Sequence, residues 1–268
     1  MKKRIFLALL LVAAAWLAGR YVTGRGGDSG GEEATGLGEI HEMFELQAGA
    51  QVEVRGINGP VTVETSETTT AEVHVTRTAR DPGDSVEQKI LIDHTPRSLV
   101  VRGENGGRGG WWRKLFGGGG RHAETRVTLK LPRRVEFEAR GINGAVTVGE
   151  TEGFLSVSGV NGRVEAKQAE GQARVTGTNG GVQLTFARVG QKGVQLSGVN
   201  GKVEFRLGAE AAADVDVHGI NGRVSVTIAG ATVEREQHGQ RVRAKIGAGG
   251  PRVEVTGVNG SVNFDPAN

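Results

Sequence analysis

Apolar and polar residues alternate along this chain in short stretches that come in pairs. Around Asn58, for example, Val52 and Val54 precede the asparagine and Val61 and Val63 follow it. A period of two is typical of a strand that buries one face and exposes the other to solvent. The two stretches are separated by the tetrapeptide G-x-N-G, whose Asn-Gly pair tolerates the positive φ angles that most residues avoid. The pattern predicts a strand, a turn and a second strand.

The same unit recurs along the chain. Seven clean copies of G-x-N-G begin at Gly56, Gly141, Gly159, Gly177, Gly198, Gly219 and Gly257, and a degenerate GENG begins at Gly103. From Asn143 to Asn221 successive asparagines are 18, 18, 21 and 21 residues apart. A nearly fixed period of about 20 residues indicates a repeat architecture. The structural turn residues predicted from these copies are Asn58, Gly59, Asn143, Gly144, Asn161, Gly162, Asn179, Gly180, Asn200, Gly201, Asn221, Gly222, Asn259 and Gly260.

Two all-β architectures fit this repeat. The favoured one is a single-stranded parallel β-solenoid, similar to a β-helix, in which repeats of about 18–21 residues stack on one another. Stacked asparagines about 4.8 Å apart would pass side-chain amide hydrogen bonds along a ladder. The alternative is an antiparallel β-meander, because Asn-Gly between alternating arms is also a strong hairpin signal. The tetrapeptide is repeated almost letter for letter while the intervening turns vary, which favours the stack.

The N-terminus carries a targeting pattern. Lys2, Lys3 and Arg4 precede an apolar run from Ile5 to Ala18. Residues 1–23 are therefore predicted to be an export signal peptide or an N-terminal membrane anchor. Residues 24–38 are a glycine-rich linker, and residues 39–268 form the β-domain. By the positive-inside rule this domain lies outside the cytoplasmic membrane, anchored by the N-terminus or, after cleavage, secreted or periplasmic.

Three segments interrupt the repeat. The first is the insertion at 102–124. Leu99 and Val101, directly before it, keep the first arm of a unit, and the second arm is expected to be replaced by a glycine-rich loop. The loop carries candidates for contact with a partner or a membrane surface, namely Trp111, Trp112, Arg113, Lys114 and Phe116. The alternative is a loop that folds back over an open end of the domain. Residues 65–97 show no clear register, and residues 231–250 are expected to hold an unmarked unit with its own loop.

Composition and charge narrow the function. The chain has 268 residues with 45 glycines and no cysteine, which excludes disulfides and thiolate chemistry. Its 33 basic and 30 acidic residues give a formal net charge of +3, which argues against a nucleic-acid partner. No P-loop and no zinc-site spacing occurs in the sequence. The sequence therefore predicts no cofactor, no metal site and no catalytic residue.

The outward positions of the predicted strands form columns when the units are stacked. Two residues after the asparagine, a basic column is expected from Arg163, Gly181, Lys202 and Arg223, and beside it lies a partly acidic one from Glu165, Gln183, Glu204 and Ser225. We expect a mutually compensated, solvated face, with binding of a polyanionic glycan as the alternative. Asp214 and Asp216 are expected to form a solvated edge, and His218 to lie on the surface.

Several motifs together resemble a known family. The repeated GING and GVNG, the LKLP at Leu129 to Pro132 that leads into a GING unit, and the closing IGAGGPRVEVTGVNGSV resemble the bacterial putative-adhesin domain family. That family has a β-solenoid fold and is related to the head-GIN adhesins. The resemblance covers about Ile40 to Phe264 and implies an exported or envelope-attached protein with no established catalytic activity.

The sequence thus predicts a non-enzymatic, exported cell-envelope protein. It would act as an adhesin or structural binding module with a protein or glycan partner at the cell surface. The alternative is a membrane-anchored regulatory partner in envelope-stress signalling. A glycan-active enzyme is the third and least supported hypothesis.

Overall fold

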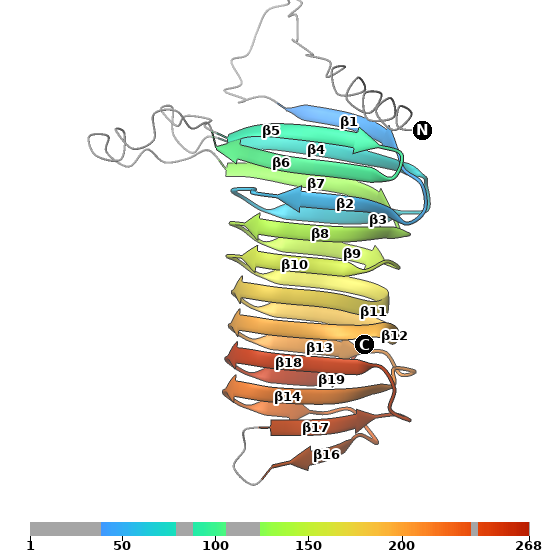
Figure 1. Cartoon of the computed structure of the whole chain (residues 1–268), viewed down its shortest axis with the longest axis vertical. Coiled ribbons are helices and arrows are strands. Elements are labelled where there is room, and N and C mark those ends of the chain that lie inside the picture. Colours follow the sequence, from blue (N-terminus) through green and yellow to red (C-terminus); the bar gives the residue numbers. More distant parts are fainter. Residues whose placement is uncertain (1–38, 79–87, 106–123, 237–240, 268) are drawn as a thin grey trace, which may run out of the picture. The chain divides into compact units, whose positions relative to one another are not determined.

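The computed structural model describes residues 39–78, 88–105, 124–236 and 241–267. By its contacts the chain divides into the units Met1–Ala34 and Thr35–Asn268, and all described residues belong to the second. The described residues are all-β (Figure 1). The strands are β1 (Ile40–Glu45), β2 (Ala50–Arg55), β3 (Val61–Ser66), β4 (Thr70–Thr78), β5 (Gln88–Thr95), β6 (Ser98–Asn105), β7 (Glu124–Pro132), β8 (Val135–Ile142), β9 (Val146–Thr151), β10 (Leu155–Val160), β11 (Val164–Asn179), β12 (Val182–Asn200), β13 (Val203–Leu207), β14 (Ala213–Asn221), β15 (Val224–Val226), β16 (Thr232–Arg235), β17 (Arg241–Ile246), β18 (Arg252–Asn259) and β19 (Val262–Pro266).

The two arms of each unit lie in two different layers. Layer A contains the arms that precede the G-x-N-G corner, in the order β6, β2, β8, β10, the second part of β11, the second part of β12, β18 and β14. Layer B contains the arms that follow the corner, in the order β7, β3, β9, the first parts of β11 and β12, β13, β19 and β15. All of these pairings are parallel.

Equivalent residues of successive units stack on one another. In layer A, Leu155 pairs with Phe137 on one side and with Ala173 on the other. In layer B, Val164 pairs with both Val146 and Val182. Within the described residues, no pairing joins the two arms of one unit. The antiparallel meander of Asn-Gly hairpins is therefore wrong, because each corner turns the chain from one layer to the other.

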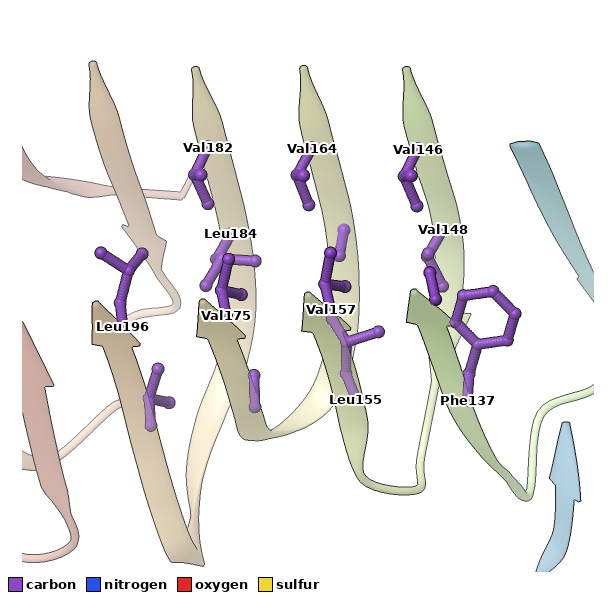
Figure 2. Close-up of a cluster of buried hydrophobic side chains, with 14 of the residues drawn as sticks. Phe137, Val146, Val148, Leu155, Val157, Val164, Val175, Val182, Leu184 and Leu196 are labelled. Carbon is purple, nitrogen blue, oxygen red and sulfur yellow. The ribbon is translucent and has the colours of Figure 1, made fainter. Parts of the chain in front are cut away.

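The core lies between the two layers. Figure 2 shows hydrophobic side chains from both layers filling the space between the strands. The positions six and four before and three and five after each corner asparagine are buried as the alternation predicts, and only Val226 in the last unit is half-buried. Phenylalanines extend this stacking in layer B, where the ring centroids of Phe205 and Phe264 lie 4.7 Å apart. The sequence period of two therefore determines which side chains fill the core.

The spatial order of the units differs from their order in the chain. The unit of Asn259 lies between those of Asn200 and Asn221, because β18 pairs with both β12 and β14 (Figure 1). The insertion at 102–124 also differs from its prediction. Its second arm is present as β7, where Val127 and Leu129 stack on Val61 and Val63. The expected replacement of this arm by a loop is wrong, since the arm is delayed in sequence and not lost.

Both ends of the stack are antiparallel. At one end β1 pairs with β4, β4 with β7 and β5 with β6, and at the other β17 pairs with β14 and β16. The clean parallel solenoid predicted from the repeat is therefore corrected to a mixed sheet. The reason is local, because the segments 65–97 and 231–250 lack the corner motif. Thr95 and Ser98 pair across a two-residue turn, which returns the strand beside itself. The unmarked unit expected at 231–250 is the hairpin β16–β17.

Candidate functional site

One corner of the stack carries a ladder of side-chain amides. Each asparagine Nδ2 donates to the Oδ1 of the next one, over 2.7 to 3.2 Å, in the order Asn221, Asn259, Asn200, Asn179, Asn161, Asn143 and Asn58. The ladder expected from the sequence is present, and it follows the spatial order of the units. All six hydrogen bonds run in the same direction. Because each one joins two neighbouring units, the ladder helps to fix the register of each unit on the next.

The two glycines of the corner have different roles. The first adopts a left-handed conformation in every copy, with φ between 60° and 65°. The second lies against the neighbouring unit, where a Cβ on Gly180 would come within 2.2 Å of the carbonyl oxygen of Gly162. The sequence analysis placed the conformational demand on the Asn-Gly pair. The structure places it on the glycine two residues before the asparagine and, in five copies, also on the glycine after it, where φ lies between 143° and 158°. This second glycine also packs closely against the neighbouring unit.

β12 bulges between its first part, in layer B, and its second part, in layer A, where the repeat lengthens from 18 to 21 residues. In the pairing of β11 with β12, Gly171 lies opposite Val189 but Ala173 lies opposite Val194. Gln172 alone therefore faces the four residues 190–193, and the extra residues form a bulge. The bulge carries Lys192, whose Nζ lies 5.5 Å from the ring centroid of Phe154 and 4.0 Å from Oε1 of Glu136. The longer spacing thus places a cation over an aromatic ring two units away.

A concave site lies under this bulge. We call it the bulge hollow, a space of about 300 Å³ lined by Glu136, Phe154, Ala173, Arg174, Lys192 and Gln195. Ala173 is buried, Phe154 is half-buried, and the side chains of Arg174 and Lys192 are exposed. The Nε of Arg174 donates to Oε1 of Gln195 over 3.2 Å. The hollow therefore combines an aromatic ring with two cations, a carboxylate and an amide, the mixture of apolar and polar groups found in ligand sites.

Small hydroxylated residues continue this face of layer A toward the corner. Ser156 lies opposite Arg174 in the register, Ser158 lies opposite Thr176, and Thr176 lies opposite Ser197. All four hydroxylated side chains are half-buried. Ser158, Thr176 and Ser197 therefore form a row of short polar side chains between the hollow and the asparagine ladder, with Arg140 in register beside Ser158 at one end. We call this surface, with the bulge hollow, the A face.

A cluster of charges lies at the far end of layer A. Asp216 accepts hydrogen bonds from Arg241 at 2.5 and 2.8 Å and from Arg252 at 3.1 Å, and its side chain is only 13% exposed. The hydrogen bonds from Arg241 hold the pKa of Asp216 below its ordinary value, against the opposing effect of burial. Asp216 is thus not the solvated edge expected from the sequence, because β17 and β18 bring arginines to it. Asp214 is exposed, and His218 is half-buried beside Asp216.

The outward columns of layer B also differ from their prediction. Glu165 and Gln183 lie in register, and Gln183 lies opposite Glu204 as expected. Lys202 pairs with Glu204, and its hydrogen bond lowers the pKa of that carboxyl. The basic column does not continue from Lys202 to Arg223, because β19 lies between β13 and β15 and places Ser261 there. Layer B is a compensated surface with no column of one sign.

Some predicted features lie elsewhere or are absent from the described part of the chain. Trp111, Trp112, Arg113, Lys114 and Phe116 lie outside the described residues. Among the residues that the structure describes, no three His, Cys, Asp or Glu side chains are grouped so that they could hold a metal ion. A search of the same residues finds no helix with the length and apolar character needed to cross a membrane.

The bulge hollow was not predicted from the sequence. Phe154, Lys192 and Arg174 belong to no motif, and only the change of repeat length from 18 to 21 residues marks the place. The change predicts an enlarged turn but not which side chains the enlargement brings together. Those side chains come from four successive units of layer A.

Comparison with known proteins finds matches among solved structures but no family. No protein family matches the sequence, and no curated protein matches it. A putative cell adhesion protein from Clostridium sporogenes is 11% identical over 85% of this chain and 99% of that one, with a TM-score of 0.39. Putative adhesins from Parabacteroides merdae and Parabacteroides distasonis are each 14% identical over 84% and 85% of this chain and 95% and 97% of theirs, with TM-scores of 0.26 and 0.24. At these values the function has to be inferred from the chain's own surfaces.

Proposed function

We propose that this chain is an exported, non-enzymatic binding module of the bacterial cell envelope. It acts as an adhesin or structural protein, and its A face contacts a glycan or protein at the cell surface. In this proposal the repeated units work as a short β-solenoid between two antiparallel ends, and residues 1–23 provide the export signal or the anchor.

The observation that carries the proposal is the alignment of outward side chains on layer A. Parallel pairing places the same positions of successive units side by side, as for Ser158, Thr176 and Ser197. The asparagine ladder holds these positions at the spacing of the strands, about 4.8 Å. A partner with its own repeating groups, such as a polymer, can therefore make the same contact several times. Repeated weak contacts of this kind give useful avidity without a deep pocket.

The outward carboxylates of layer A support a binding role. Glu138 accepts a hydrogen bond from Arg140, which lowers the pKa of Glu138, and Asp216 is held by Arg241 and Arg252. A general acid needs a pKa near the working pH, so it must be raised and not lowered. These carboxylates are arranged to stay ionised and paired, which suits a stable surface better than proton transfer.

Deletion of the reading frame tests the proposal. We expect the deletion strain to lose adhesion to host or abiotic surfaces, and complementation with the full chain to restore it. Protease added to intact cells should cleave the complementing protein, because the domain lies outside the cytoplasmic membrane. Unchanged adhesion together with a pull-down that recovers one stoichiometric membrane protein would instead favour the regulatory partner. Turnover of cell-wall glycans by the purified chain would favour the enzyme.

A further inference from the structure

We propose that the bulge hollow binds a carboxylated sugar, namely a uronic acid residue of an acidic polysaccharide. The sugar carboxylate binds the guanidinium of Arg174, and one face of the sugar ring packs on Phe154. This inference rests on the proposed function, because it names the class of ligand that the A face takes.

The size of the hollow suits a single sugar ring. Its volume of about 300 Å³ lies at the lower end of the range for small-molecule sites. It is open on the outer surface of layer A, so the neighbouring sugars of a chain can leave it on either side. The flat row of Ser158, Thr176 and Ser197 beside it leaves room for those sugars and offers hydroxyl groups to them. An internal residue of a polymer can therefore enter without a free chain end.

The charge of the hollow selects a carboxylate. Arg174 uses only its Nε for the hydrogen bond to Gln195, and the structure gives its two Nη atoms no other partner among the described residues. A guanidinium with both Nη groups available binds a carboxylate through two parallel hydrogen bonds. Lys192 adds a second cation, whereas Glu136 is the one carboxylate in the lining. The surplus of positive charge favours an acidic sugar over a neutral one.

The aromatic ring distinguishes a sugar from other anions. Phe154 is half-buried directly before β10, with the Lys192 Nζ over its ring. The side chain of Lys192 is 62% exposed and flexible, so it can move aside and leave the ring to a ligand. One face of a sugar ring presents mainly C–H groups, which pack on an aromatic ring as other apolar surfaces do. Gln195 and Glu136 then accept hydrogen bonds from the sugar hydroxyls at the edge of the ring.

Calorimetric titration of the purified full-length chain tests this inference. The probes are trigalacturonate, its fully methyl-esterified form and hexaglutamate. The ester keeps the sugar without the charge, and hexaglutamate carries carboxylates without the sugar. We expect only trigalacturonate to bind measurably. Arg174→Gln should weaken its binding at least tenfold, and Phe154→Leu, which keeps an apolar side chain, should weaken it severalfold. Arg188→Gln is the matched control, because Arg188 is an exposed arginine on β12 that pairs with Glu170 outside the hollow.

Each other outcome overturns the inference. Equal binding of the ester shows that the carboxylate is not recognised, and equal binding of hexaglutamate shows that the sugar is not. The same affinity in Arg174→Gln and Arg188→Gln means that the ligand binds elsewhere. If none of the probes binds, the proposed site does not exist. The Arg174→Gln variant in the adhesion assay separates this inference from the proposed function. If the Arg174→Gln variant no longer binds trigalacturonate but still supports adhesion, the proposed binding function is retained and the uronate site is not what adhesion depends on.

Discussion

The interior units and the unit of Asn221 are built from one sequence pattern but are held together differently. An interior unit such as that of Asn179 has parallel neighbours on both sides in both layers. The unit of Asn221 has a parallel neighbour on one side only, and its second arm is reduced to the three residues of β15. In layer A its other side is covered by the antiparallel strand β17.

This difference changes which interactions stabilise each region. In the interior, backbone hydrogen bonds, the amide ladder and aligned aliphatic side chains repeat from unit to unit, so each unit is a template for the next. At the end the template stops, and Ile220 and Val226 are only partly buried. There the contacts are specific, as in the bonds from Arg241 and Arg252 to Asp216. Repetition stabilises a unit only to the extent that a neighbour is present.

The largest expected effect is the loss of close packing at an interior corner. In Gly180→Ala the new Cβ would lie 2.2 Å from the backbone oxygen of Gly162, which cannot move without shifting the whole unit. We expect a loss of roughly 3 kcal/mol in the free energy of unfolding, measured by denaturant titration. Gly230→Ala is the control for a positive φ without a clash, since Gly230 has a φ of 75° and nothing within 4 Å of a Cβ, whereas Gly180 combines a φ of 153° with the close contact. It should lose only about 1 kcal/mol, from backbone strain. Equal losses would mean that packing between units is not limiting.

The second prediction compares the middle of the ladder with its end. Asn179 donates to Asn161 and accepts from Asn200, whereas Asn221 only donates, to Asn259. Asn179→Ala removes two hydrogen bonds, for an expected loss of about 2 kcal/mol, and Asn221→Ala removes one, for about 1 kcal/mol. Thermal unfolding followed by circular dichroism gives the difference. If the two variants unfold at the same temperature, the ladder follows from the stack and does not stabilise it.

The third prediction concerns the charged end and its pH dependence. Because the pKa of Asp216 is lowered in the folded state, its contribution is complete above the ordinary aspartate pKa of about 4 and is lost as the pH falls through the lower, folded value. Asp216→Asn should therefore lower the melting temperature at pH 7, and the difference from the wild type should shrink below about pH 4. Asp214→Asn, an exposed neighbour on the same strand, should change little. A gap for Asp216→Asn that stays constant down to pH 2 contradicts this account.

Much of the interior could be predicted from the sequence because every local signal agreed. The alternation around Asn143 and Asn161 fixes which side chains are buried, and the repeated asparagine indicates the ladder. The order of the units could not be predicted in the same way. The edges of equivalent units are alike, so the alternation does not specify that β18 lies between β12 and β14. That choice depends on the hairpin β16–β17, which occupies the other side of β14.

The candidate site was harder to predict than the fold. The outward positions of layer A that line the bulge hollow carry no periodic signal, so the sequence does not show which of them meet. Phe154 and Lys192 are brought together only by the bulge beside Gln172, and a bulge redirects side chains that the regular register would keep apart. The charged cluster at Asp216 was missed for a similar reason. Its arginines come from strands whose neighbours were assigned only by the structure.

The smallest expected effect comes from replacing a polar residue in an otherwise aliphatic interior column. In the column of residues that precede the corner asparagines, Thr178 lies between Val160 and Val199. It is buried, and the structure gives its Oγ1 no hydrogen-bond partner. A buried hydroxyl without a partner is destabilising, and valine has nearly the same shape. Thr178→Val should therefore raise the free energy of unfolding by about 1 kcal/mol. Thr176→Val, on the outward side of the same strand, should bring no gain. A loss of stability in Thr178→Val would mean that the hydroxyl is satisfied in solution, and that the interior column tolerates a polar group because water or a neighbouring carbonyl reaches it.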